Sequence, residues 1–192
     1  MAEKKFDPKK LEKLNNPQRL KDIPPAFIRG RLINPTPQTF IEIGAGTGFF
    51  CIAFIKEFKP KRVYACDLSP TMIEWMQDNV APEYPAIVPI QTTEDQVPLD
   101  DGCAELVFMI NLHHELHNPV NSLKEGCRLL KPGGEIFIVD WKKQQMEQGP
   151  PIEIRCDPEE VKSQLEQAGF NQIASYNDLK KQFLVTGRKP SP

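Results

Sequence analysis

The stretch FIEIGAGTGFF, residues 40–50, brings an acid and three glycines to the junction between an expected strand and an expected helix. Gly44, Gly46 and Gly48 stand at alternate positions, and Glu42 precedes them by two residues. Glycine lets a ligand approach the backbone without a Cβ in the way, and the first N–H groups of a helix have no partner within it. A purely structural turn would often need only one glycine. We therefore expect a ligand with polar groups to lie across Gly44–Gly48.

A second acid, Asp67, ends the next expected strand in VYACDLSP. A carboxylate at this place can accept hydrogen bonds from both hydroxyls of a ribose. The dinucleotide fingerprint G-x-G-x-x-G is not met, because Phe49 stands where its third glycine would fall. The residues therefore favour a ligand that contains a nucleoside over one that presents a pyrophosphate.

All three histidines, His113, His114 and His117, lie in NLHHELHNP, just after the fourth expected strand. Imidazole titrates near neutrality and could act as a base or position an acceptor. Packing under the loop is the alternative. A metal site is disfavoured, since only His113 and His117 are four residues apart and no further ligand is evident. Asp140, at the end of the fifth expected strand, could face an acceptor or cap the following turn.

Short apolar runs alternate along the chain with helix-like segments. Such an alternation predicts a parallel sheet covered on both faces. Two final runs, at Ile173–Tyr176 and Gln182–Thr186, are joined too closely for a crossover and should form an antiparallel hairpin. The other expected strands are Thr39–Ile43, Arg62–Cys66, Ile87–Ile90, Leu106–Ile110 and Glu135–Asp140, with helices at 47–58, 70–80, 118–130 and in DPEEVKSQLEQAGF.

Length and composition fit one ordinary globular domain. The chain has 192 residues and a net charge of −2, which gives no global electrostatic reason to expect nucleic acid. No apolar run approaches the roughly 20 residues of a membrane helix, and the N-terminus does not resemble a secretory signal. Five scattered cysteines predict reduced thiols and a cytoplasmic protein. Residues 1–16 are predicted to form a flexible arm and residues 17–192 a single domain.

The motifs EIGAGTG, CDLSP, VPLDDGCAELVF and LLKPGGEIFIVDW occur in this order along the chain. In order and spacing they resemble the class I S-adenosylmethionine-dependent methyltransferases, in particular the ubiquinone/menaquinone-biosynthesis-like (type 11 or domain 25) group. The resemblance covers roughly residues 17 to 188. It implies a Rossmann-like α/β fold whose seven-stranded, mostly parallel sheet has the order 3-2-1-4-5-7-6 with strand 7 antiparallel.

The same resemblance assigns site residues. His114 matches a histidine common in the group and is the first choice for a catalytic residue. Thr93 departs from the Asp or Asn of many relatives. The residues expected to bind the cofactor are Glu42, Gly44, Ala45, Gly46 and Gly48 at the methionine part, Asp67 at the ribose, Leu68, Thr93 and Glu94 at the adenine, and Asn111 near the methionine end.

The sequence thus predicts an S-adenosyl-L-methionine-dependent methyltransferase that acts on a small-molecule acceptor. The alternatives are a non-catalytic S-adenosylmethionine-binding protein or partner subunit and, less favoured, an NAD-dependent dehydrogenase. A homodimer is compatible with this prediction, whereas nucleic acid and membrane insertion are not expected. The residues that choose the acceptor should lie in the N-terminal segment and in the loop 141–156.

Overall fold

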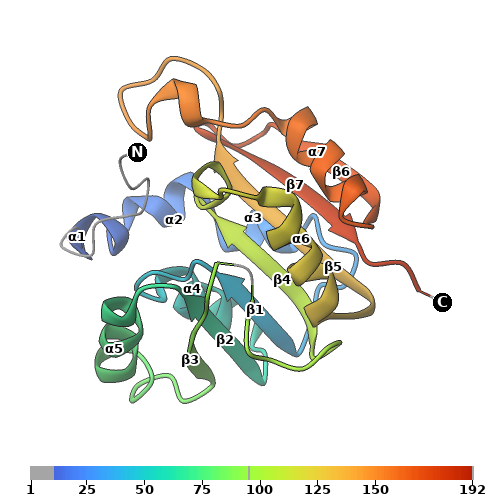
Figure 1. The fold of residues 1–192 in the computed structure, drawn as a ribbon. Helices are drawn as coiled ribbons and strands as arrows, with labels where there is room; N and C mark the ends of the chain where they lie inside the picture. Colours follow the sequence, from blue (N-terminus) through green and yellow to red (C-terminus); the bar gives the residue numbers. More distant parts are fainter. Residues whose placement is uncertain (1–10, 95, 192) are drawn as a thin grey trace.

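The computed structural model describes residues 11–94 and 96–191 and contains one seven-stranded sheet (Figure 1). Its strand order is β3-β2-β1-β4-β5-β7-β6. The first five strands pair in parallel, and β7 runs antiparallel to both β5 and β6. The expected fold class and C-terminal hairpin are therefore confirmed. The strands are β1 Thr39–Ile43, β2 Arg62–Asp67, β3 Ile87–Gln91, β4 Ala104–Ile110, β5 Leu130–Trp141, β6 Asn171–Tyr176 and β7 Gln182–Arg188.

Helices cover both faces of the sheet and form two separate cores. Residues of α3, α4 and α5 pack in one cluster, where Phe54 and Phe108 meet edge to face with ring centroids 5.0 Å apart. Residues of α6 and α7, among them Leu123 and Leu165, pack in the other. The helices are α1 Leu11–Leu14, α2 Gln18–Asp22, α3 Pro25–Arg29, α4 Phe49–Phe58, α5 Pro70–Asn79, α6 Pro119–Leu129 and α7 Pro158–Gln167, with short 3₁₀ turns at His113–Glu115 and Ile152–Ile154.

Two element boundaries differ from the sequence expectation for backbone reasons. The helix expected from residue 47 begins at Phe49, because Gly48 before it takes a left-handed conformation with φ 72°. Leu130, expected to be the last residue of α6, starts β5 instead and pairs with Ala104 of β4. The fifth strand is thereby longer than the expected Glu135–Asp140.

The structure describes the expected N-terminal arm only in part. Residues 1–10 of that arm lie outside the described residues, but residues 11–14 form α1. Asn15 accepts a hydrogen bond from the Thr47 hydroxyl at 2.8 Å, and Arg19 donates one to the carbonyl of Leu14. Within the described residues, Leu14 and Asn15 of the expected arm thus contact neighbouring segments, including the glycine loop.

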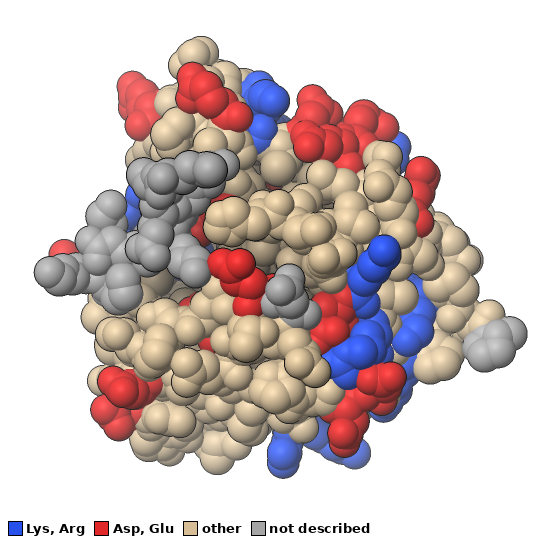
Figure 2. Space-filling model, in the orientation of Figure 1, with Lys and Arg blue, Asp and Glu red and all other residues tan. Residues whose placement is uncertain are grey.

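Charged side chains are mixed on the face shown in Figure 2. Lys131 pairs with Glu105, and Arg128 pairs with Asp101 and Glu125. No helix among residues 11–94 and 96–191 has the length and apolar character needed to cross a membrane.

Candidate active site

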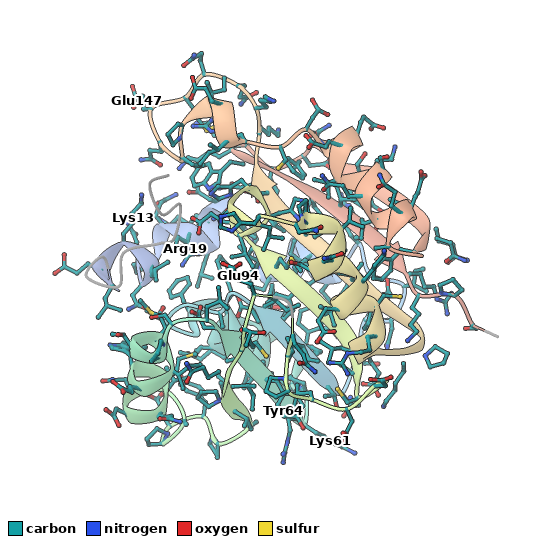
Figure 3. The ribbon with its side chains drawn as sticks, viewed as in Figure 1. Lys13, Arg19, Lys61, Tyr64, Glu94 and Glu147 are labelled. Atoms are coloured by element: carbon teal, nitrogen blue, oxygen red, sulfur yellow. The ribbon has the colours of Figure 1, made fainter. Side chains whose placement is uncertain are left out.

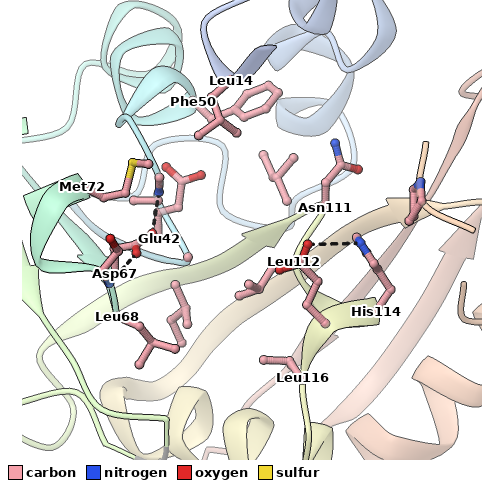
Figure 4. A pocket seen from close by; sticks show the side chains of 18 of the residues that line it. Leu14, Glu42, Phe50, Asp67, Leu68, Met72, Asn111, Leu112, His114 and Leu116 are labelled. Carbon is pink, nitrogen blue, oxygen red and sulfur yellow. Dashed lines mark hydrogen bonds and ion pairs between the residues drawn. The ribbon is translucent and has the colours of Figure 1, made fainter. Parts of the chain in front are cut away.

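A cavity of about 960 Å³ opens at the carboxyl ends of the parallel strands, where ligands bind in open α/β sheets. Glu42 near the end of β1, Asp67 at the end of β2 and Asn111 just after β4 point into the same space, and His114 lies on the side of Asn111 (Figure 4). The sequence predicts a site at this edge. Of the residues expected at the site, Gly48 is absent from the lining, and the other ten line the cavity: Glu42, Gly44, Ala45, Gly46, Asp67, Leu68, Thr93, Glu94, Asn111 and His114.

The glycine loop is tied to the second strand by Asp67. Its Oδ2 accepts a hydrogen bond from the Gly46 backbone N–H at 2.7 Å, and its Oδ1 accepts one from Ser69 at 2.9 Å. Burial raises the pKa of Asp67, and these backbone hydrogen bonds act against that rise. Each carboxylate oxygen has a second lone pair, so Asp67 can still accept the two hydroxyls of a ribose.

Both the backbone conformation of Gly46 and the space around it require glycine. Its φ of 55° is a conformation that side-chain-bearing residues rarely adopt, and a Cβ at this position would lie 3.2 Å from the Leu14 side chain. Gly44 is packed more closely still, since a Cβ there would come within 2.6 Å of Leu112. Backbone conformation and packing therefore explain these glycines, and close approach of a ligand to the backbone is compatible with the same explanation.

Glu42 is 2% exposed and accepts a hydrogen bond from the Cys51 thiol at 2.8 Å. Burial raises its pKa to about 8, although the Cys51 hydrogen bond and the charge of Arg19 act in the opposite direction. Burial likewise lowers the pKa of Arg19 to about 10, against the attraction of Glu42. The Arg19 guanidinium lies over the Phe50 ring, 4.7 Å from its centroid. Figure 3 shows Arg19 on α2, and this residue lines the cavity. Glu42 is thus a largely neutral acid at pH 7, able to ionise for a cationic ligand.

The residues expected at the adenine also line the cavity. Leu68 is 37% exposed there. The Thr93 hydroxyl is used locally, because it accepts the backbone N–H of Gln96 at 3.1 Å. Glu94 lies 3.6 Å from the imidazole of His117. Leu68 therefore offers an apolar surface for a base, while the Thr93 hydroxyl already bonds Gln96.

Asn111 has two unusual features for a residue beside a ligand site. Its φ is 54°, in the left-handed region, and its Oδ1 is buried with no hydrogen-bond partner among the described residues. Buried polar atoms are nearly always paired, and strained, unsatisfied residues cluster at functional sites. Asn111 thus has unused hydrogen-bonding capacity at the cavity wall.

The three histidines separate in the fold. His113 is directed away from the cavity lining and contacts Gln164 of α7 at 2.6 Å. His117 is exposed. His114 has a side chain 4% exposed and is bound to Asp140 twice, through its backbone N–H at 2.9 Å and through Nδ1 at 2.8 Å. Within the described residues, no group of three His, Cys, Asp or Glu side chains could hold a metal.

Asp140 decides the charge of His114. Burial lowers the pKa of His114, but the hydrogen bonds to Asp140 and Glu115 and their charges outweigh burial and raise it to about 9. At neutral pH this histidine is therefore an imidazolium and not the neutral base that a pKa near 6–7 would give. Asp140 itself faces His114 instead of an acceptor, and it also accepts the Trp141 N–H at 2.7 Å.

Sequence reasoning missed two residues near Trp141. Gln182 lines the cavity, is 1% exposed, and pairs with Trp141 across β5 and β7. Arg155 is 5% exposed, and all five of its N–H donors bind backbone carbonyls of the loop before it, at Lys142, Gln144, Gln148 and Pro150. The only sequence signal was the loop 141–156 itself, which has no motif that reports these contacts.

Comparisons with known proteins identify the family. A model described as a methyltransferase domain matches residues 41–138, just over half of the chain. A crystal structure of a SAM-dependent methyltransferase from Aquifex aeolicus has a TM-score of 0.88 and 30% identity, covering 96% of this chain and 99% of that one. The chain belongs to the S-adenosylmethionine-dependent methyltransferases. The predicted family, its cofactor S-adenosylmethionine and its enzymatic class are therefore confirmed.

Curated relatives match over a shorter range. A malonyl-acyl-carrier-protein O-methyltransferase of Hahella chejuensis is 34% identical over 104 residues, which are 53% of this chain and 36% of that protein. The ubiquinone/menaquinone biosynthesis C-methyltransferase UbiE of Chromobacterium violaceum is 28% identical over 106 residues, 54% of this chain and 43% of the relative. The matched part of the chain thus spans less than half the length of these two relatives.

Proposed function

We propose that this methyltransferase transfers a methyl group from S-adenosylmethionine to a small-molecule acceptor. One observation carries the proposal: one cavity is lined both by Gly44–Gly46 and Asp67 and by His114 and Trp141. The relatives named above are, by their printed names, a malonyl-acyl-carrier-protein O-methyltransferase and a ubiquinone/menaquinone biosynthesis C-methyltransferase, which is compatible with a small acceptor group. Basic residues such as Arg128 are ion-paired, which does not favour nucleic acid.

The proposed cofactor-binding roles follow from the hydrogen bonds and charges that the lining residues can still offer to a ligand. Asp67 would accept the ribose hydroxyls, Glu42 would ionise beside the cationic methionine end, and Asn111 would bond that end through its unsatisfied amide. Leu68, Thr93 and Glu94 would face the adenine. When bound, the sulfonium supplies a methyl group that needs only an aligned nucleophile.

His114 is proposed as the catalytic residue. Its Nδ1 would donate to Asp140, and its Nε2, which lies 3.6 Å from Glu115 Oε1, would turn from that carboxylate to donate a hydrogen bond to the methyl acceptor. An imidazolium favours an acceptor that is already ionised, because it stabilises negative charge without taking a proton. Base catalysis would require the minority of molecules that have lost the proton at neutral pH. We also infer a cytoplasmic location, since all five cysteines are free thiols.

The test is an incubation with isotopically labelled S-adenosylmethionine and the low-molecular-mass fraction of a cell extract, read by mass spectrometry. We expect one class of small molecules to gain the labelled methyl group. Binding of S-adenosylhomocysteine in calorimetry with no labelled product in any extract fraction would favour the non-catalytic binding protein. The variant Asp67→Ala, assayed in parallel, separates transfer at this site from contaminating activity.

A further inference from the structure

Gln182 is an unexplained polar residue in the wall of the cavity. It is 1% exposed, yet its Oε1 has no hydrogen-bond partner in the described part of the chain. Leaving a buried amide oxygen unpaired destabilises a protein, because the oxygen has lost its hydrogen bonds to water. A methionine of similar length would avoid this penalty, so the stability of the fold gives no reason for glutamine here.

The position of Gln182 points to the acceptor rather than the cofactor. Its residue partner across the sheet is Trp141, and Asp140, which binds His114, is paired with the next residue, Phe183. Directly opposed residues of an antiparallel pair have side chains on the same face and in contact range. Successive side chains of a strand point to opposite faces, so Gln182 and Trp141 lie on the face opposite to Asp140, which binds His114. In the sheet, β4 separates β5 and β7 from β1 and β2, whose ends carry Gly46 and Asp67. Gln182 and Trp141 therefore line the cavity beyond β4, away from Asp67.

Trp141 is itself held in place from behind. A Cβ on Gly149 would lie 2.8 Å from the Trp141 ring, so the loop backbone packs directly on the indole. Arg155, which binds that loop, has its guanidinium carbon 6.0 Å from the ring centroid. The indole thus forms a fixed apolar wall, and Gln182 adds one polar group to it. A pocket that is mostly apolar with few placed polar groups is how small-molecule sites achieve specificity.

We propose that Gln182 is a specificity residue for the methyl acceptor, which carries an N–H or O–H group that donates a hydrogen bond to Gln182 Oε1. The terminal torsion of glutamine is broad, so the amide can rotate to bring this oxygen to the ligand. An acceptor with such a donor satisfies the buried oxygen, and an analogue without it leaves the oxygen unpaired and binds less tightly. This inference rests on the proposed methyl transfer.

The experiment compares Gln182→Met with Gln164→Met. Gln164 is the control, because it is a glutamine outside the cavity lining whose side chain is hydrogen-bonded to His113. The readouts are the melting temperature of the free protein, S-adenosylhomocysteine affinity by calorimetry, and methyl transfer from labelled S-adenosylmethionine into the low-molecular-mass extract. Because the extract contains all acceptors at natural concentrations, transfer reports on recognition of the acceptor whatever its chemical identity.

The two substitutions should have opposite effects. Gln182→Met should melt at the wild-type temperature or above it, bind S-adenosylhomocysteine as the wild type does, and transfer methyl groups roughly ten- to a hundredfold more slowly. Gln164→Met should melt at a lower temperature, because it leaves His113 without its partner, and transfer at the wild-type rate. Gln182→Glu keeps an acceptor oxygen and should retain more transfer than Gln182→Met.

The outcomes that overturn the inference are distinct. Wild-type transfer by Gln182→Met shows that the acceptor does not need this residue, and a melting temperature several degrees below the wild type shows a structural role. If Gln182→Glu and Gln182→Met lose methyl transfer equally, the methyl acceptor does not donate a hydrogen bond to this residue. A wild-type enzyme that binds S-adenosylhomocysteine but transfers nothing overturns the proposed function, and this inference with it.

Discussion

At the scale of single residues, the buried charged groups of the site each have two tasks. Asp67 holds the backbone of Gly46 and Ser69 while keeping lone pairs for a ligand. Asp140 holds both the backbone and the ring of His114. A substitution at either residue should therefore change the loop as well as the ligand affinity, and a useful test must measure both.

Asp67→Ala should weaken S-adenosylhomocysteine binding by roughly 1.5–3 kcal/mol, the range for hydrogen bonds to a charged group. It should also lower the melting temperature, because Gly46 and Ser69 lose their acceptor. Asp67→Asn keeps one oxygen and should fall between the wild type and alanine in calorimetry. If Asp67→Ala binds like the wild type while circular dichroism shows an intact fold, Asp67 does not bind the ligand.

His114 should make stability depend on pH. Its pKa in the fold, about 9, lies above the ordinary value of 6.5, so its contribution is complete below about pH 6.5 and is lost as the pH rises through about 9. We expect the difference in melting temperature between the wild type and His114→Gln to shrink from pH 6 to pH 10. His117→Gln, at an exposed position, is the control.

The same charge state predicts the pH dependence of methyl transfer. If the His114 imidazolium binds an ionised methyl acceptor, the rate of methyl transfer should stay level between pH 7 and 8 and fall as the pH passes about 9. A rate that rises up to pH 9 would instead identify His114 as a general base.

At the scale of elements, two loops define the cavity by different means. The turn between β1 and α4 depends on left-handed glycines, and the loop 141–156 depends on one buried arginine. The first is recognisable from its residue types, while the second is held by long-range contacts that only the folded chain creates.

Gly46→Ala should harm both the turn and the ligand site. A side chain at a left-handed position costs roughly 1–2 kcal/mol, and the new Cβ would lie 3.2 Å from Leu14. We expect a lower melting temperature and a smaller upward shift on adding S-adenosylhomocysteine. Gly30→Ala is the matched control, since Gly30 has φ −68° and lies outside the cavity lining. An unaltered ligand shift in Gly46→Ala would favour a purely structural turn.

Arg155→Met should release the loop 141–156 without affecting the cofactor end. It removes five N–H donors from backbone carbonyls, so proteolysis and amide exchange in residues 142–150 should become faster. S-adenosylhomocysteine affinity should remain close to the wild-type value. Arg62→Met, at an exposed arginine of β2, should change neither measurement. Faster exchange in residues 44–51 would contradict this separation.

At the scale of the whole molecule, the cavity joins segments from both ends of the chain. Leu14 of α1 and Asn15 after it lie against the glycine loop. Lys181, just before β7, bonds both Asp22 of α2 and Gln148 of the loop 141–156. The N-terminal helices are therefore part of the site and not an appendage of the domain.

Ligand binding should accordingly protect distant segments together. Adding S-adenosylhomocysteine should slow amide exchange in residues 11–23 as well as in 44–51, because Leu14 and Arg19 line the same cavity as Gly46. The β6–β7 hairpin beyond Gln182 serves as an internal control. Protection confined to residues 44–51 would show that α1 and α2 do not close over the cofactor.

The sequence alone determined the sheet, the glycine turn and the acid after β2, because strand periodicity, glycine spacing and the position of Asp67 are local signals. Tertiary structure decided the part of the cavity proposed to hold the acceptor. Asp140 meets His114 across 26 positions of the chain, and Trp141 meets Gln182 through the register of β5 and β7. Such pairings depend on which strands become neighbours. The raised pKa of His114 and the unpaired oxygen of Gln182 exist only once those neighbours and their burial are in place.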